Sequence, residues 1–191
     1  MDASVGKYSG DAALMKAVAQ GRRAAVETLL DKYMLMVSRV SYRILCDRPD
    51  SDAVTLAVFR KICRSASGFD GRQNLHEYLC RLMCSMCHIR MIRRRLLDLF
   101  YISPSLYETS DPLPHSPEED YITKETWEIF CRASRNLTYR QRVVFALCEM
   151  EQLPMSEVEA VTGLSAGRIK EHIRAARKQI RTELEVYGKV R

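Results

Sequence analysis

The chain has no long hydrophobic run and few of the residues that interrupt helices. None of its 191 residues lies in an apolar stretch of about 18, so no membrane insertion is expected. Only six prolines and eight glycines occur, and long segments repeat apolar residues with a helical period, which predicts an all-α fold. The N-terminal segment MDASVGKYSGDAAL lacks the apolar core of a secretory signal, so we expect a cytoplasmic protein.

Residue patterns typical of catalysis are also scarce. The four histidines are scattered along the chain at His76, His88, His115 and His172. No phosphate-binding loop, carboxylate pair or nucleophile beside a base stands out in the sequence. The sequence therefore predicts a protein that is not an enzyme and that needs no cofactor.

The seven cysteines predict free thiols, because a cytoplasmic protein is kept reduced. Cys80, Cys84 and Cys87 fall on one face of an expected helix, where small apolar side chains normally pack into a core. The string CSMCH also fits haem attachment, but that chemistry requires export. A zinc site that includes His76 is the other alternative. Structural zinc usually takes ligands from separate elements, so we expect core packing and no metal.

Positive charge is the main compositional signal, and it is densest near the C-terminus. The chain has 30 Lys and Arg residues and 24 Asp and Glu residues, and the resulting net charge of +6 suits a nucleic-acid partner. The segment Leu137–Leu184 predicts an amphipathic helix, a short helix, a tight turn at 162–165 and a long basic helix. This order is typical of a helix-turn-helix, whose second helix enters the major groove of DNA.

The last helix carries two stripes. Its apolar stripe consists of Ile169, Ile173, Ala176, Ile180 and Leu184, and its basic stripe of Lys170, Arg174, Arg177 and Arg181. We expect contacts to base edges or nearby phosphates from Arg168, Glu171 and His172, and contacts mainly to the DNA backbone from Lys170, Arg174, Arg177 and Lys178. Ser165 is a candidate N-cap beside N–H groups that suit a phosphate. The alternative is a solvated basic helix packed on a bundle.

Proline marks a boundary between two parts of the chain. Four of the six prolines lie in 103–120 together with acidic residues, which predicts a flexible linker over 101–120. The linker joins two small helical domains, 11–100 and 121–187, the second a helix-turn-helix. The expected helices are 11–20, 22–46, 52–65, 75–97 and 121–135, followed by one that Thr138 and Gln141 open as a capping box.

A resemblance to a known family covers roughly 11–184. In the second part it rests on residues at fixed spacing: Leu137, Arg142, Val144, Phe145, Leu147, Leu153, Glu157, Val158, Gly163, Ser165, Gly167, Ile169, Lys170, Ala176 and Arg177. In the first part it rests on Arg43-Ile44-Leu45 with Asp47, on Val58-Phe59 and on Arg93–Arg95. In these motifs the chain resembles a bacterial RNA polymerase sigma factor of the extracytoplasmic-function (ECF) group, which keeps only sigma regions two and four.

The resemblance implies partners and sites. The first domain would dock on core RNA polymerase through Asp50, Asp52, Ala53, Leu56, Ala57 and Arg60. It would also capture a flipped base of the melted minus-ten strand through Phe69, Asp70, Arg72, Gln73 and Asn74, since such a base needs stacking and hydrogen bonds. An ordinary glycine-containing connection is the alternative for that loop. The duplex backbone would be held by Arg90, Arg93, Arg94 and Arg95. The second domain would bind double-stranded promoter DNA at the minus-thirty-five element, and an anti-sigma factor is a further expected partner.

The chain departs from the family pattern at several positions. The usual acidic-glutamine pattern before Val58-Phe59 is replaced by Ala53, Leu56 and Ala57. Tyr78-Leu79, Ser85, Gln152, Glu159 and Arg168 stand where the family has Trp-Leu, asparagine, glycine, alanine and threonine. Two alternatives therefore stay open: a stand-alone helix-turn-helix regulator, and a degenerate sigma-like interaction protein.

Overall fold

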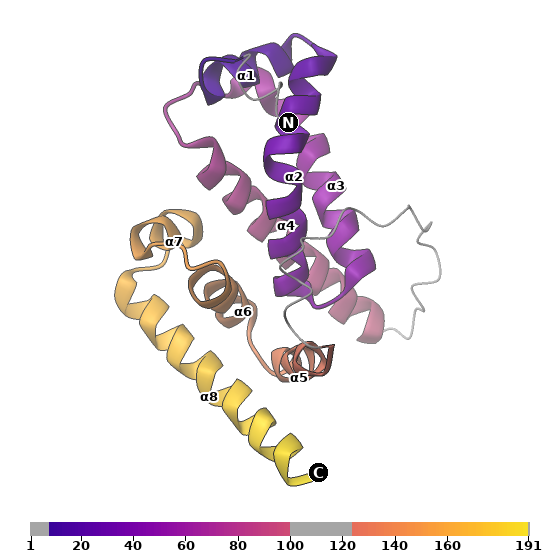
Figure 1. Cartoon of the computed structure of the whole chain (residues 1–191), viewed down its shortest axis with the longest axis vertical. Coiled ribbons are helices and arrows are strands. Elements are labelled where there is room, and N and C mark those ends of the chain that lie inside the picture. The colour runs from indigo at the N-terminus through magenta and orange to yellow at the C-terminus, as the bar shows by residue number, and fades with distance from the viewer. Residues whose placement is uncertain (1–7, 100–123, 191) are drawn as a thin grey trace.

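The structure is a computed structural model that describes residues 8–99 and 124–190. The regular elements within these two ranges are helical and include no strand, so the all-α prediction is confirmed (Figure 1). The first range holds α1 (Asp11–Ala19), α2 (Arg23–Leu45), α3 (Arg48–Ser65), the 3-10 turn η1 (Ala66–Gly68) and α4 (Leu75–Leu99). The second holds α5 (Lys124–Arg135), α6 (Tyr139–Phe145), the π-helical turn η3 (Ala146–Met150), α7 (Met155–Thr162) and α8 (Ala166–Val190).

Helices α2, α3 and α4 form a bundle, and α1 packs across one end of it (Figure 1). The sequence predicted that α3 begins at Asp52, which is too late, because the helix begins at Arg48. The Asp47 carboxylate accepts a hydrogen bond from the Asp50 N–H at 2.9 Å, and Pro49 lies in the first turn. An N-cap acceptor with proline just inside the helix favours this earlier start.

Local signals also set the helix ends of the second range. The predicted capping box is confirmed: Thr138 Oγ1 accepts from the Gln141 N–H, and Gln141 Oε1 accepts from the Thr138 N–H. Gly163 ends α7 with a φ of 69°, a left-handed conformation that glycine adopts without strain. The chain then enters α8, so α7 and α8 form the predicted helix-turn-helix.

The two ranges pack directly on each other. Buried side chains from both belong to one hydrophobic cluster, in which α4 meets α6 and α7 (Figure 1). Polar contacts reinforce this packing, since Arg39 of α2 donates to the Glu151 carboxylate at 2.8 Å and His76 Nδ1 of α4 lies 2.5 Å from Glu157 Oε1 of α7. The division into domains 11–100 and 121–187 stays a prediction, and the predicted linker 101–120 lies outside the described residues.

The three clustered cysteines lie inside the bundle. Cys80, Cys84 and Cys87 are 1%, 6% and 0% exposed, and burial raises the pKa of Cys80 and of Cys87 to about 12. Such thiols stay protonated and pack as small apolar groups. Among the described residues, no three His, Cys, Asp or Glu side chains gather in a way that could hold a metal ion. None of the described helices combines the length and apolar character that a membrane span requires.

Candidate nucleic-acid interface

The orientation of α8 is fixed by its apolar stripe. Ile169 and Ala176 are fully buried against the rest of the second range, and Ile173 and Ile180 are half-buried. The stripe leaves the core at its far end, where Leu184 is 46% exposed. Because one face of α8 is held in this way, the basic stripe is directed outward.

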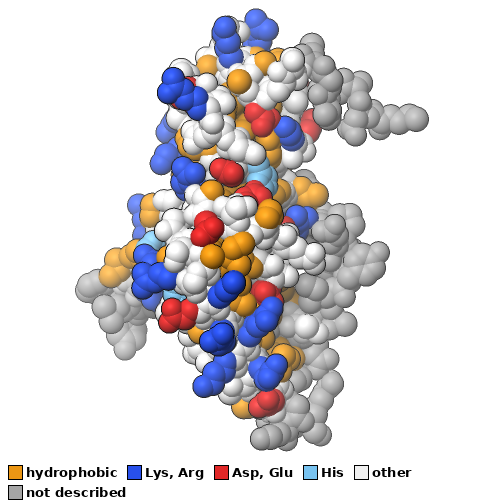
Figure 2. Space-filling model, turned by 90° about the vertical axis from the view of Figure 1, so that its left-hand side faces the viewer, with side chains coloured by type: hydrophobic (Ala, Val, Ile, Leu, Met, Phe, Trp, Pro, Cys, Tyr) orange, Lys and Arg blue, Asp and Glu red, His pale blue; other side chains and the backbone are white. Residues whose placement is uncertain are grey.

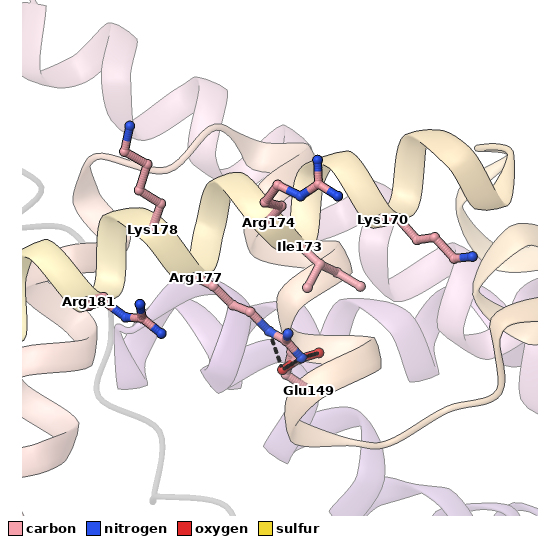
Figure 3. A pocket seen from close by; sticks show the side chains of 7 residues that line it. All are labelled: Glu149, Lys170, Ile173, Arg174, Arg177, Lys178 and Arg181. Carbon is pink, nitrogen blue, oxygen red and sulfur yellow. Dashed lines mark hydrogen bonds and ion pairs between the residues drawn. The ribbon is translucent and has the colours of Figure 1, made fainter.

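A groove of about 540 Å³ runs along this outward face. It is lined by Glu149, Lys170, Ile173, Arg174, Arg177, Lys178 and Arg181 (Figure 3). Five of these seven side chains are cationic, and Figure 2 shows Lys and Arg gathered over the lower part of the same side of the molecule. A surface of this charge is suited to the phosphates of a nucleic-acid backbone.

One member of the predicted phosphate-binding set is engaged within the protein. The Arg177 guanidinium donates to both carboxylate oxygens of Glu149, with Nε–Oε2 at 3.0 Å and Nη2–Oε1 at 2.9 Å (Figure 3). Arg174 and Lys178 point away from that carboxylate (Figure 3). Arg181 also lines the groove. The sequence predicts Arg181 as a member of the basic stripe but predicts no DNA contact for it.

The start of α8 holds the residues predicted to contact bases. Arg168 and Glu171 are exposed, and His172 is half-buried. Ser165 directly precedes the helix, but the first N–H of α8, that of Ala166, donates to Glu159 Oε1 of α7 at 2.6 Å. A carboxylate at a helix N-terminus is favoured by the helix dipole, and it competes there with a DNA phosphate. Glu159 fulfils this capping role from the preceding helix, and no sequence pattern indicates it.

The arginines predicted to hold duplex DNA lie on the last turns of α4. Arg90 Nε donates to Asp50 Oδ1 at 2.7 Å, and Arg94 Nη1 donates to Asp47 Oδ2 at 2.6 Å. These two arginines therefore tie α4 to the start of α3. Arg93 and Arg95 are exposed.

The same ion pairs change the expected polymerase-binding set. Asp50 and Asp52 are only 9% and 7% exposed, and Asp52 pairs with Arg48 at 3.3 Å. Both carboxylates are thus turned into the protein. On the outer side of α3, Leu56 is 40% exposed, Arg60 is exposed, and Ala53 and Ala57 are half-buried. These four residues form the part of the predicted set that a partner could contact.

The loop predicted to hold a flipped base is ordered by local bonds. Phe69 is half-buried and its ring lies 6.0 Å from that of Tyr78. Asp70 Oδ1 accepts from the Arg72 N–H at 3.0 Å, and Asn74 Oδ1 accepts from the His76 N–H at 2.8 Å, which caps α4. Arg72 is exposed and Gln73 half-buried. The loop therefore brings together the aromatic ring and the polar groups expected of it. The Phe69 side chain is partly buried against the helical bundle.

Comparisons with known proteins agree with this geometry. The family model "Sigma-70, region 4" matches residues 130–180, which include α6, α7 and the first part of α8. The ECF RNA polymerase sigma factor SigE of Mycolicibacterium smegmatis is 24% identical over 169 residues. That match covers 87% of this chain and 65% of SigE, so the chain spans about two thirds of that relative's length.

Solved structures share the fold. CnrH, in complex with the cytosolic domain of CnrY, superimposes with a TM-score of 0.65 at 18% identity, over 92% of this chain and 97% of that one. The sigma factor RpoE of Bartonella quintana, in complex with the anti-sigma factor NepR, gives 0.61 at 15% identity, over 84% and 96%. The chain is thus similar to sigma factors of the ECF group in its region 4 match and in its relative SigE, and it shares the fold of the two solved structures.

Proposed function

We propose that the protein is a sigma factor that binds core RNA polymerase and directs promoter recognition and transcription initiation. The observation that carries the proposal is the helix-turn-helix α7–α8, in which buried Ile169 fixes α8 and turns a cationic groove outward. The relative SigE is named as an RNA polymerase sigma factor, which supports the same function. Polymerase supplies the catalysis, and the protein would act with it in the cytoplasm.

In this proposal α8 binds the minus-thirty-five element. Arg168, Glu171 and His172 contact bases, while Lys170, Arg174 and Lys178 contact phosphates, with Arg181 added from the groove. Arg177 joins them only when a phosphate oxygen replaces the Glu149 carboxylate. In the N-terminal part, the melted strand is bound by Phe69, Asp70, Arg72 and Asn74. The duplex is bound by Arg93 and Arg95, and polymerase is contacted by Leu56 and Arg60.

The exposed apolar residues of α4 support a protein partner as well. Ile89, Ile92 and Leu96 are 51%, 45% and 49% exposed and recur at helical spacing on one face. An apolar helix face of this kind is typical of an interaction site. The structures of CnrH and RpoE are complexes with CnrY and with the anti-sigma factor NepR, and we propose that an anti-sigma factor also binds this chain.

In vitro transcription tests the proposed function. Purified protein is added to bare core polymerase on a library of genomic fragments, and RNA 5′ ends are mapped. New start sites are expected only when both components are present. A stand-alone regulator would give none, and a degenerate sigma-like protein would co-purify with core polymerase yet give none. Either result would refute the proposed function.

Substitutions in α8 should separate base contacts from phosphate contacts. Arg168→Ala is expected to lower discrimination at particular bases by about 1–3 kcal/mol, because an arginine at the helix start can pair with a guanine edge. Arg174→Ala should weaken binding to all sequences alike and reduce the salt dependence by about one phosphate contact. Competition binding against single-base promoter variants at several salt concentrations measures both. A uniform loss from Arg168→Ala would contradict its assignment to bases.

A further inference from the structure

The loop 69–74 lies against helix α1. Both are at the same end of the helical bundle, where α1 also contacts the turn η1 that precedes the loop (Figure 1). The closest approach is between Gly71 of the loop and Ala12 in the first turn of α1. A Cβ atom on Gly71 would lie 2.9 Å from the Cβ atom of Ala12. Non-bonded carbon atoms prefer a separation of about 3.5–4.0 Å, so in this arrangement position 71 accommodates only glycine.

The backbone at Gly71 gives a second reason for glycine. Its φ is 73°, a left-handed conformation that other residues rarely adopt, and the hydrogen bond from the Arg72 N–H to Asp70 Oδ1 spans the turn. Gly21 has nearly the same φ, 71°, but no atom lies within 4 Å of the place where its Cβ atom would be. Gly21 therefore shows the backbone requirement alone, whereas Gly71 combines it with the contact to α1.

Helix α1 is itself held firmly at the turn that carries Ala12. The Asp11 carboxylate accepts hydrogen bonds from Lys32 Nζ at 2.7 Å and from the Tyr33 hydroxyl at 3.3 Å, both on α2. The inner side of α1 is buried in the bundle through Leu14, Met15, Ala17 and Val18. Because Asp11 directly precedes Ala12, these contacts fix the surface that α1 presents to the loop.

The loop is held from α4 as well. The Phe69 ring lies 6.0 Å from the ring of Tyr78, and the Phe69 N–H donates to the Ala66 carbonyl at 3.2 Å. Gly71 then rests on α1, while Asp70 and Arg72 on either side of it are exposed. A loop that is supported on both sides keeps its shape before a base arrives, so binding costs less conformational entropy.

We propose that Ala12 and Gly71 are positioning residues for the melted promoter strand. Their contact sets the distance between α1 and the loop 69–74, and thereby the place where Phe69 and the polar groups of the loop meet a flipped base. Neither residue touches the DNA. The inference rests on the proposed function and assigns a role in it to α1. Stacking and hydrogen bonds weaken within a fraction of an ångström, so a small displacement of the loop lowers the affinity for the strand.

A double-mutant cycle at positions 12 and 71 tests the contact. Gly71→Ala introduces the clashing Cβ atom, and Ala12→Gly removes the atom it meets, which leaves the Ala12 Cα atom at 3.9 Å, an ordinary contact distance. Holoenzyme is assembled from core polymerase and the full-length protein. The probe is a fluorescent single-stranded oligonucleotide with the minus-ten segment of a promoter mapped by in vitro transcription.

The cycle has a defined expected result. Gly71→Ala should weaken binding to the oligonucleotide by about 5- to 150-fold, the range expected for loss of one stacked base. Ala12→Gly alone should bind like the wild-type protein, and the double variant should recover most of the lost affinity. Full affinity of Gly71→Ala, or no recovery in the double variant, overturns the proposal.

Two controls separate positioning from stability. Gly21→Ala carries the same backbone strain without a contact and should bind the oligonucleotide like the wild-type protein; an equal loss there would overturn the proposal. Binding of the minus-thirty-five duplex, which we assign to α8, should be the same in all variants. If the wild-type protein gives no start sites with core polymerase, the proposed function fails. Amide hydrogen exchange over 69–74 then still decides the contact, since it should be faster in Gly71→Ala and restored by Ala12→Gly.

Discussion

Glu151→Gln is expected to lower the free energy of unfolding by about 3–5 kcal/mol, because it breaks a buried charge cluster. The Glu151 side chain is 8% exposed and accepts hydrogen bonds from Arg39 Nη2 and Arg43 Nη1, which are on side chains 19% and 11% exposed. Two guanidinium groups would lose the carboxylate that offsets their desolvation. The cluster joins α2 to the residue after η3, so this substitution should also loosen the packing between the two parts of the chain.

Urea unfolding followed by circular dichroism measures the change in stability, and small-angle X-ray scattering measures the separation of the parts. Glu27→Gln is the matched control. Glu27 pairs with Arg23 on the surface of α2, where their side chains are 56% and 93% exposed. An exposed pair of this kind contributes only about 0.2–1 kcal/mol. Equal effects of the two substitutions would show that the Glu151 cluster does not hold the parts together.

Ile169→Ala is expected to cost about 2–5 kcal/mol and to weaken binding to the upstream promoter element. Ile169 is 0% exposed and lies between Arg168 and Lys170, so its side chain holds in place the start of α8, which we propose contacts DNA. Removing three carbons leaves a cavity under that turn. The loss of affinity should appear with every promoter variant, since the whole helix start is displaced and no single base contact is removed.

Thermal or urea unfolding and DNA binding below the unfolding transition provide the two measurements. Ile92→Ala is the control for stability, because Ile92 is 45% exposed on α4 and the same truncation should change stability by no more than about 0.5 kcal/mol. Normal DNA affinity in a destabilised Ile169→Ala protein would mean that the start of α8 is positioned by other contacts.

Helix positions follow from the sequence because the signals are local. The capping box of Thr138 and Gln141, the left-handed Gly163 and the apolar stripe of α8 each lie within a few turns of the residues they organise. The predicted start of α3 at Asp52 is late because the helix is opened by the Asp47 cap and Pro49, which precede its first apolar residues. Neighbouring residues therefore suffice for the elements and for the outward basic face of the helix-turn-helix.

Long-range pairing did not follow from the sequence. Arg39 and Glu151 are 112 residues apart, and Arg90 and Asp50 are 40 apart. From the sequence alone, a charged side chain is expected to lie in solvent and to be available to a partner. Only the folded structure shows which arginines and aspartates have already met within the protein. For this reason, several residues proposed for DNA or polymerase, Asp50 among them, turned out to be engaged internally.

The short π-helical turn η3 has one further consequence. Its Glu149 holds Arg177 of α8, and Glu151, directly after it, holds Arg39 and Arg43 of α2. A phosphate that draws Arg177 away releases Glu149, and separation of the two parts releases Glu151, two residues further along the chain. If one release eases the other, DNA binding and this separation favour each other by equal free energies, and the C-terminal end of η3 acts as a thermodynamic relay between them.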